Sequence, residues 1–377
     1  MEPSQYRTFA TIDLGAIRQN FQIIRQKVGP RCKILSVIKA DGYGHGALET
    51  AQALPDSDYF GVACLAEAIA LREHGVQTPI LILGYTAPRE AEMLASYQIT
   101  QCVFSETYAD DLANVLRQTG QKLKVHFKID TGMTRLGFPA KTVKDREQTR
   151  QQILRLIQKW GNVLEPEGIF THFTSSEETN NPFTQTQFQH FLTLTEALAQ
   201  NGLQFALRHA ANSAAIFNAP QTHLDMVRPG IVLYGLTPAE SMENPGLIPA
   251  MEMKAHIAQL HILNPGETVS YNRTFTADRP MRVATVCVGY ADGYPRNLSN
   301  RAEVLVNGQR TRLLGTVCMD QCIIDATDIA LQPGDLVTLF GHSRDQFLGV
   351  AELAKAAHTI HYEIICGVSK RVPRFYL

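Results

Sequence analysis

The sequence predicts an α/β protein with an N-terminal eight-stranded TIM-type (β/α)8 barrel and a C-terminal mainly-β domain. Three observations predict it. The chain has 377 residues, which is long enough for two domains. Up to Gly235, strand-like apolar runs alternate with helix-like segments, each pair having the size of a βα unit. Beyond Ser241 the segments become short, alternating and rich in turn residues.

The first region contains eight apolar runs of strand length, which is the number that a closed barrel requires. An open, doubly wound sheet would give a similar alternation, so the pattern alone leaves both architectures open. The runs are Ile34–Lys39, Tyr59–Ala63, Ile80–Tyr85, Gln101–Phe104, Lys124–Asp130, Gly168–Phe173, Leu207–Asn212 and Met226–Gly235.

Helices are expected between these runs. In Asp13–Val28, apolar residues recur at spacings of three and four behind Asp13, whose carboxylate suits the cap of a helix. Val62–His74 and Thr186–Gln200 show the same helical pattern. The alternation of strand and helix therefore continues through the barrel region.

The turn-rich sequence Glu243–Gly246 marks the expected boundary between domains at residues 1–243 and 244–377. The second domain is expected to be built mainly of strands joined by tight turns at Asn307-Gly308 and Pro333–Asp335. Its clearest expected elements are a hairpin of Glu303–Val306 and Arg310–Leu314, a strand Leu336–Phe340 and one helix, Val350–Ala357.

Composition excludes several classes of function. Lys plus Arg total 35 against 36 Asp plus Glu, so the chain lacks the basic excess of a nucleic-acid-binding protein. No stretch resembles a signal peptide or approaches the ~20 apolar residues of a membrane span, so a cytoplasmic protein is expected. The seven cysteines are odd in number and form no CxxC pair, which favours buried reduced thiols over disulfides or a metal site.

In a barrel the reacting groups lie at the carboxyl ends of the strands. Lys39 closes an apolar run, where burial disfavours its ammonium form and makes it a good amine nucleophile. A surface lysine at a strand end is the alternative, but Gly42, Gly44 and Gly46 favour a ligand close to the backbone. Such a lysine forms a Schiff base either with a substrate carbonyl or with pyridoxal phosphate.

The loops after the seventh and eighth runs favour the phosphate-bearing cofactor. Asn212 and Ser213 precede a helical run, and Gly230 offers a backbone N–H, so together these loops can form an anion cradle. For Ser213 alone, a plain helix cap is the competing interpretation. Arg228 can instead form an ion pair with Asp225 or Asp130.

His172, next to the end of the sixth run, can equally be a hydrogen-bonded core residue. Cys318, Asp320 and His172 are possible metal ligands, but no short paired spacing supports a metal site, so no metal is expected.

Eight motifs in the same order make the whole chain resemble the bacterial alanine racemase family, pyridoxal-phosphate enzymes with a barrel and a C-terminal β domain. The most specific is Val37-Ile-Lys-Ala-Asp-Gly-Tyr-Gly-His-Gly46. The others are Asp130-Thr-Gly-Met-Thr-Arg-Leu-Gly137, Thr171-His-Phe173, His209-Ala-Ala-Asn-Ser213, Val227-Arg-Pro-Gly-Ile231, Val269-Ser-Tyr271, Gly289-Tyr-Ala-Asp-Gly293 and Cys318-Met-Asp-Gln321.

The resemblance implies interconversion of L- and D-alanine, which supplies D-alanine for peptidoglycan. Lys39 would bind pyridoxal 5'-phosphate covalently and act as the base for D-alanine, while Tyr271 would be the base for L-alanine. Two bases on opposite faces are what removal and return of an α-proton requires. In the family Tyr271 is presented across a dimer interface, so a homodimer with shared active sites is implied.

The resemblance also assigns the surrounding residues. Arg228 would face the pyridine nitrogen, with His172 beside it. Arg135 would lie near the cofactor phenolic oxygen and the substrate carboxylate, which the backbone N–H of Met319 would also bind. Lys128 matches a position that is carbamylated in many members. The phosphate would be held by residues of several loops, namely Tyr43, Asn212, Ser213, Gly230, Ile231 and Tyr362.

The entrance to the site would carry Tyr290 and Arg296, with Cys318 and Asp320 in supporting positions. A constriction between Tyr290 and Tyr362 favours a substrate as small as alanine, so a racemase acting on serine or on many amino acids is the nearest alternative. A non-catalytic pyridoxal-phosphate-binding protein, a barrel decarboxylase and a class I aldolase are more distant ones. The second domain with Tyr271 and Met319 argues against a non-catalytic binding protein. The sequence Cys318–Gln321 argues against a decarboxylase, and Arg228 argues against an aldolase.

Overall fold

The computed structural model describes residues 2–377, which form two compact units. The barrel unit comprises Ile17–Gly42 and Ala47–Ile248, and the C-terminal unit comprises the chain up to Ala16, Tyr43–Gly46 and Pro249–Leu377. The units differ from the expected domains at the N-terminus. Strand β1 (Thr8–Ile12) pairs with β11 (Met251–Leu263), so the start of the chain packs with the C-terminal unit.

The barrel unit contains eight parallel strands, one for each apolar run in the sequence. They are β10 (Met226–Val227), β2 (Lys33–Val37), β3 (Tyr59–Val62), β4 (Ile80–Ile82), β5 (Ile99–Val103), β6 (Leu123–Asp130), β8 (Leu164–Phe170) and β9 (Leu207–His209), in this spatial order. A parallel bridge between Asn212 and Arg228 joins the ends of β9 and β10. The ring of strands is therefore nearly closed, which confirms the barrel over an open sheet.

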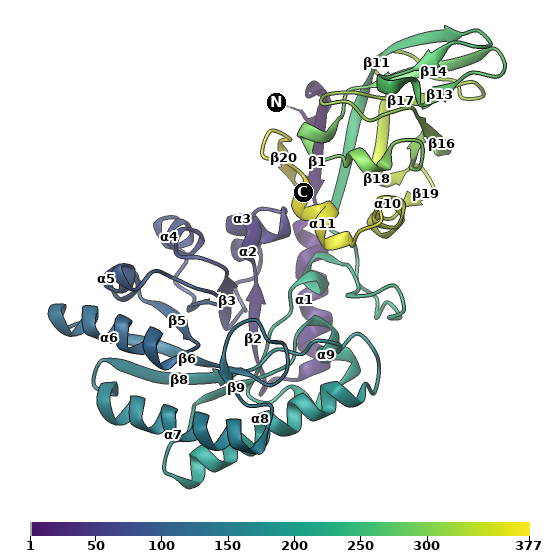
Figure 1. The fold of residues 1–377 in the computed structure, drawn as a ribbon. Helices are drawn as coiled ribbons and strands as arrows, with labels where there is room; N and C mark the ends of the chain where they lie inside the picture. The colour runs from purple at the N-terminus through teal and green to yellow at the C-terminus, as the bar shows by residue number, and fades with distance from the viewer. Residues whose placement is uncertain (1) are drawn as a thin grey trace. The chain divides into compact units, whose positions relative to one another are not determined.

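Helices surround the strands on the outside (Figure 1). Helix α1 (Leu14–Val28) begins where the sequence predicted, because the Asp13 carboxylate accepts a hydrogen bond from the Ala16 N–H at 2.9 Å. The predicted helix Val62–His74 begins three residues late, because Val62 belongs to β3. The other helices are α2 (Lys39–Tyr43), α3 (Ala47–Ala53), α4 (Leu65–Glu73), α5 (Ala91–Ser96), α6 (Glu106–Thr119), α7 (Val143–Trp160), α8 (Pro182–Gln200) and α9 (Ser213–Asn218).

Strand β6 is buried on both faces, as barrel strands are. Val125, Phe127 and Ile129 form one face, and the Phe127 ring packs against neighbouring phenylalanines. The alternate residues His126 and Lys128 are also buried, although both are polar. With Asp130 at its end, the strand therefore brings three titratable groups into the interior of the molecule.

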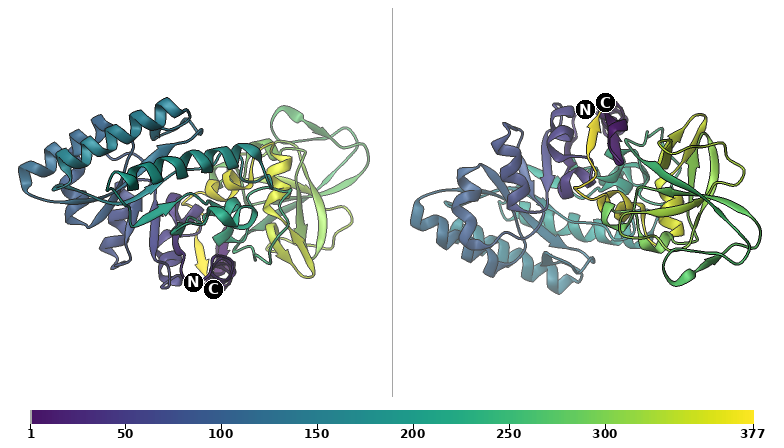
Figure 2. Two further views of the ribbon diagram at one scale, coloured as in Figure 1. Left: turned by 90° about the horizontal axis from the view of Figure 1, so that it is seen from below. Right: turned by 90° about the horizontal axis from the view of Figure 1, so that it is seen from above.

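The C-terminal unit is mainly β, as predicted. Its nine-stranded sheet has the order β19 (Gln346–Leu348), β18 (Leu336–Ser343), β15 (Glu303–Val306), β16 (Gln309–Leu314), β17 (Cys322–Asp325), β14 (Met281–Val286), β11, β1 and β20 (Arg374–Tyr376). Strand β11 also pairs with β18, which closes the middle strands on themselves. Strands β1 and β20 run parallel, so the two ends of the described chain lie side by side (Figure 2).

Two expectations about the chain were wrong. The C-terminal unit has two helices, α10 (Val350–Ala356) and α11 (His361–Gly367), where the sequence indicated one. The cysteines are all unbridged, but only Cys32, Cys102 and Cys322 are buried, and Cys64 and Cys366 are exposed. Within residues 2–377, no helix combines the length and apolar character needed to cross a membrane.

Candidate active site

The sequence suggested that Lys39 ends its strand, but the strand β2 ends at Val37. Lys39 follows Ile38 and begins α2. The following residues have left-handed backbone angles, with φ of 53° at Ala40 and Asp41 and 61° at Gly42. Left-handed conformation costs about 1–2 kcal/mol for each residue that carries a Cβ, so the turn requires support. The Glu67 carboxylate supplies part of it by accepting a hydrogen bond from the Ala40 N–H at 2.8 Å.

Glu67 also accepts a hydrogen bond from the Ala63 N–H at 2.7 Å, so it ties the loop after β2 to the loop after β3. The Asp41 carboxylate accepts a further hydrogen bond from the Ala47 N–H at 2.9 Å. Gly42 is tightly surrounded, because a Cβ there would meet Thr50 Oγ1 and the Ala47 backbone. The strained turn that carries Lys39 is therefore held rigidly in place.

The cationic residues predicted at the carboxyl ends of the strands do gather there, around His172. The pKa of His172 lies well below its ordinary value because burial disfavours its charged form and because cationic side chains surround it. In order of influence, these side chains are Lys128, Arg228, Arg135 and Lys39. His172 is therefore a neutral imidazole within a cationic cluster.

Lys128 is one of the two buried cations of this cluster; the other is Arg228. Burial, and then Arg228, lower its pKa to about 7, so near neutral pH a large fraction of the side chain is a free amine. Its Nζ lies 4.5 Å from the centroid of the Phe170 ring, and Arg228 Cζ lies 5.4 Å from the same centroid. Phe170 thus packs against both cations through its ring.

Arg228 is 4% exposed, and the ion pairs considered for it do not form. Asp225 pairs with Arg208 at 2.9 Å, and Asp130 pairs with Lys141 at 3.0 Å. Arg228 instead donates hydrogen bonds to backbone carbonyls and to two imidazoles. The acceptors are Thr171 O at 2.8 Å, Ala210 O at 3.0 Å, His209 Nδ1 at 3.0 Å and His172 Nδ1 at 3.2 Å.

The loops after β9 and β10 meet, as the phosphate cradle requires. Ser213 Oγ accepts a hydrogen bond from the Gly230 N–H at 2.8 Å. The interpretation of Ser213 as a plain cap is wrong, because Asn212 Oδ1 caps α9 by accepting from the Ala215 N–H at 3.0 Å. Ile231, which follows Gly230, begins a short 3₁₀ turn.

In the C-terminal unit, Tyr271 is 69% exposed and stands on a tightly shaped turn. The residues on either side, Ser270 and Asn272, both have φ of 62°. Ser270 Oγ donates to Thr316 O at 2.6 Å and lies 3.2 Å from Cys318 Sγ, while Thr316 Oγ1 donates to Tyr271 O at 3.0 Å. The turn is therefore fixed by the segment that leads into the Cys318 motif, while the phenol points outward.

Backbone hydrogen bonds join the Gly289 and Cys318 motifs in the same unit. The N–H groups of Tyr290 and Ala291 donate to the carbonyls of Cys318 and Met319, each at 3.0 Å. A Cβ at Gly289 would clash with both carbonyls. Tyr290 and Met319 are 43% and 53% exposed, so with Tyr271 they place three large apolar side chains on linked, exposed turns.

The remaining predicted residues also lie in the C-terminal unit. The rings of Tyr43 and Tyr362 are 6.2 Å apart between centroids. Burial raises the pKa of Tyr43, with Cys366 adding to the effect, so it is a neutral phenol. Arg296 is exposed, and Asp320 forms an ion pair with Arg371. No three His, Cys, Asp or Glu side chains within residues 2–377 form a group that could hold a metal ion.

Sequence reasoning missed the side chains that hold the predicted ones. Glu67 and His126 carry no signal as single residues, and His209 was given no role although it begins one of the quoted motifs. The one available clue was the alternation of polar residues, His126 and Lys128 among them, with apolar ones, because it places both on the same face of β6.

Two family models match the chain, one described as "Alanine racemase, N-terminal domain" over residues 12–238 and one as "Alanine racemase, C-terminal domain" over residues 250–376. The chain belongs to the alanine racemase family. It is 42% identical over 374 residues to an alanine racemase of Desulforamulus reducens, with 98% of each chain covered.

Solved structures agree with this membership in the family. An alanine racemase of Clostridium difficile 630 matches with a TM-score of 0.91 and 37% identity, covering 99% of this chain and 96% of that one. An alanine racemase of Bacillus anthracis with bound L-Ala-P matches with a TM-score of 0.91 and 32% identity, covering 98% of this chain and 95% of that one. The likeness to alanine racemases therefore includes both units.

Proposed function

We propose that this protein interconverts L- and D-alanine by a two-base mechanism that uses pyridoxal 5'-phosphate. Membership of the alanine racemase family over both units supports the activity. The single structural observation that carries the proposal is the cationic cluster of Lys39, Lys128, Arg135 and Arg228 around His172, at the end of the barrel where the Ser213–Gly230 cradle also lies.

The donor set at this end of the barrel fits a phosphorylated pyridine. Ser213 Oγ and the Gly230 N–H already bond each other at 2.8 Å and can turn to an anion, since a hydroxyl both donates and accepts. Arg228 offers donors to an acceptor nitrogen, and its guanidinium has no readily lost proton. When bound, the cofactor would act as an electron sink that makes the α-proton of an amino acid acidic.

The phosphate would be held chiefly by Ser213, Gly230 and Ile231, with Tyr43 and Tyr362 proposed from the family resemblance. Asn212 would act indirectly, because its side-chain oxygen is engaged by Ser176 Oγ and by the Ala215 N–H. The cofactor would be attached through Lys39, which the rigid left-handed turn holds at the strand end.

Proton transfer would use Lys39 on one face of the reacting carbon and Tyr271 of the partner subunit on the other. Racemisation requires both, because a single base would return the proton to the face from which it came. The exposed position of Tyr271, beside exposed Tyr290 and Met319, supports a role at a contact between two copies of the chain.

The substrate carboxylate would be bound by Arg135 and by the backbone N–H of Met319. Lys128 would steady Arg135, because a buried amine with a pKa near 7 can react with carbon dioxide to give a carbamate that attracts the guanidinium. Tyr290 and Arg296 would line the entrance, with Cys318 and Asp320 shaping the segment around Met319.

A racemisation assay tests this function. Purified protein supplied with pyridoxal phosphate should convert L-alanine to D-alanine, measured by chiral chromatography, and Lys39→Ala should abolish this conversion. Lys122→Ala, which alters an exposed lysine on the same unit, is the matched control. Borohydride reduction followed by peptide mapping should place the cofactor on Lys39. Comparable kcat/KM values for serine and alanine would instead favour the broad-specificity alternative.

A further inference from the structure

Arg228 is a buried cation without a directly bonded carboxylate. Among residues 2–377, no ion pair joins Arg228 to an Asp or Glu side chain, and the four groups that accept its hydrogen bonds are neutral. A buried charge is strongly destabilising unless an opposite charge or well-placed dipoles compensate it. The carbonyls and imidazoles around Arg228 supply dipoles only, so a compensating negative charge comes from beyond its immediate neighbours.

A chain of hydrogen bonds leads from Arg228 through the barrel to a carboxylate. His209 Nδ1 lies 3.0 Å from Arg228, and His209 Nε2 lies 2.9 Å from His126 Nδ1. His126 Nε2 in turn lies 3.2 Å from Glu167 Oε2. Both imidazoles are fully buried, so water does not interrupt the chain. The outer oxygen of Glu167 accepts from Lys124 Nζ at 2.9 Å.

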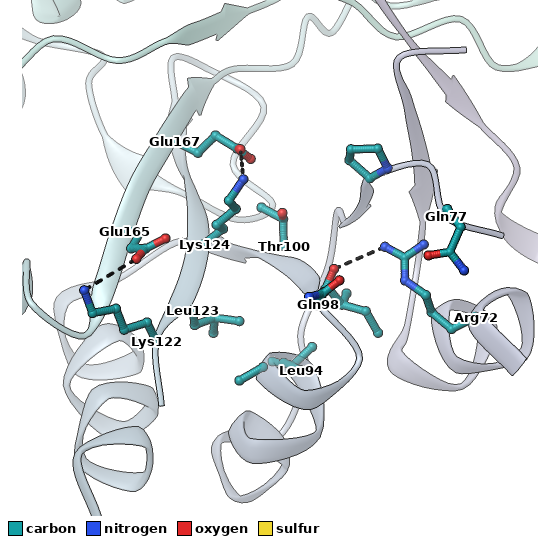
Figure 3. Close-up of a pocket in the computed structure, with 13 residues that line it drawn as sticks. Arg72, Gln77, Leu94, Gln98, Thr100, Lys122, Leu123, Lys124, Glu165 and Glu167 are labelled. Atoms are coloured by element: carbon teal, nitrogen blue, oxygen red, sulfur yellow. Dashed lines mark hydrogen bonds and ion pairs between the residues drawn. The ribbon is translucent and has the colours of Figure 1, made fainter. Parts of the chain in front are cut away.

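Glu167 and Lys124 lie at the opposite end of the barrel from Arg228. They line a pocket of about 430 Å³ beside the amino-terminal ends of β5, β6 and β8 (Figure 3). In this view Glu167 and Lys124 point toward each other, and a second pair joins Lys122, just before β6, to Glu165 on β8. The chain of hydrogen bonds thus connects this pocket, at the amino-terminal ends of the barrel strands, with the carboxyl ends of the strands, where the proposed chemistry takes place.

The direction of every hydrogen bond in this chain follows from its two ends. Arg228 can only donate, so His209 Nδ1 must accept and His209 Nε2 must carry the proton. That proton is donated to His126 Nδ1, which leaves the proton of His126 on Nε2, facing the Glu167 carboxylate. Burial lowers the pKa of both histidines, and the pKa of Glu167 falls to about 2 because His126 and Lys124 stabilise its charged form against the opposing effect of burial.

Two local features of β8 place Glu167 for this role. The register of β8 against β6 shifts between Pro166 and Gly168, so Glu167 occupies a bulge, which re-aims a side chain. Gly168 follows directly, and a Cβ there would lie 2.6 Å from the His126 ring. The bulge and Gly168 together allow the Glu167 carboxylate to reach the His126 imidazole. Both features belong to the same short segment of β8.

We propose that Glu167 is a positioning residue for the reaction, acting through His126 and His209 to fix the donor geometry of Arg228 and to supply the negative charge that offsets it. The proposal deepens the function proposed above and rests on it for its kinetic consequences. Each histidine is held in one tautomer by its neighbours, because the proton on one ring nitrogen is set by the partner of the other. Without Glu167 as an acceptor, no group fixes the proton of His126 on Nε2.

The direct test is nitrogen NMR of the histidine rings in the holoenzyme. In the unaltered protein, His126 and His209 should both be neutral and protonated on Nε2 throughout the pH range of activity. In Glu167→Leu, His126 loses its acceptor and the two rings should show mixed tautomers. A His209 ring protonated on Nδ1, or charged, in the unaltered protein would overturn the proposal whether or not the protein racemises alanine.

Kinetics and cofactor absorbance give the second test. Glu167→Leu should lower kcat by about 10- to 100-fold, a typical effect of removing a residue that orients a functional group, with a smaller change in KM. The visible absorbance of the bound cofactor should shift, because Arg228 would face it differently. Lys124→Met is the matched control: it removes a partner of Glu167 that lies outside the hydrogen-bond chain to Arg228, leaves that chain intact, and should retain the ordinary kcat, pH profile and absorbance.

Glu167→Gln covers the case in which the leucine variant fails to fold. Its amide oxygen can still accept from His126, while exposed Lys124 turns to water, so the tautomers should persist and only the offsetting charge is lost. We expect an intermediate kcat and an altered pH profile. Ordinary kcat, pH profile and absorbance in Glu167→Gln, or in a folded Glu167→Leu protein, would overturn the positioning role.

Discussion

If Tyr271 serves the active site of the partner subunit, two inactive variants should restore each other's activity. Lys39→Ala removes one proposed base, and Tyr271→Phe removes only the phenolic oxygen of the other. Tyr271 is 69% exposed in the chain, so the phenylalanine variant should stay within about 0.5 kcal/mol of the original stability. Its activity should fall by about 10²- to 10⁴-fold, the usual contribution of a positioned acid or base.

The expected recovery follows from two-fold symmetry. Mixing equal amounts of the two variants under conditions of subunit exchange gives hybrid dimers as about half of the population. In each hybrid one site has lost both bases and the other retains both. The mixture should therefore recover about a quarter of the original activity, measured as D-alanine formation from L-alanine.

The controls separate subunit sharing from other causes of recovery. Mixing Lys39→Ala with the unaltered chain should give no more than dilution allows, and chemical cross-linking before mixing should prevent recovery. If both bases came from one chain, no mixture of these variants could contain an intact site. Absence of recovery under demonstrated exchange would thus refute the sharing of sites.

Three further outcomes follow from the geometry. Ser213→Ala removes the hydroxyl that accepts the Gly230 N–H at 2.8 Å, so the Kd for pyridoxal phosphate, measured by fluorescence titration, should rise about tenfold, with partial rescue by Ser213→Thr. Lys128→Met should stabilise the cofactor-free protein against urea most below pH 7, and its advantage should shrink toward pH ~10. The pKa of Lys128 is about 7 in the folded protein and ~10.4 in the unfolded chain, so the unfolded chain binds more protons between these values. The stability of the unaltered protein therefore rises with pH in this interval. Equal slopes of unfolding free energy against pH for both proteins would contradict the lowered pKa. Gly44→Ala should lower the melting temperature clearly more than Gly75→Ala, because both glycines have φ of 84° but only at Gly44 does a Cβ meet backbone, the Ile365 carbonyl.

The strands of the barrel could be predicted because their burial is nearly uniform. A strand such as β4 is apolar at every position and is bounded by turn residues, which leaves little ambiguity in the sequence. Helix α11 was missed because it has only seven residues and mixes buried and exposed positions without a clear period. Short elements that depend on tertiary packing carry little local signal.

In the candidate site, too, some features could be predicted from the sequence and others could not. The motif around Lys39 was visible because it combines a lysine with glycines at alternate positions. The left-handed angles at Ala40 and Asp41 were not, since alanine is not typical of that conformation and aspartate adopts it only occasionally. The support from Glu67, and the link from Glu167 to Arg228, depend on which strands become neighbours, so they could not be predicted from a local pattern.

The excess of positive charge at the carboxyl end of the barrel explains why one site can favour both proposed ligands. Lys39, Lys128, Arg135 and Arg228 all act on His172, and no carboxylate is among the groups that shift the pKa of this imidazole. A cluster of cationic side chains binds anions, and a phosphate together with a substrate carboxylate supplies them. The same charges lower the pKa of Lys128, so binding of these anions should raise it again. Ligand binding and the protonation of Lys128 are therefore coupled, and proton uptake measured by calorimetry in buffers of different ionisation enthalpy should disappear in Lys128→Met.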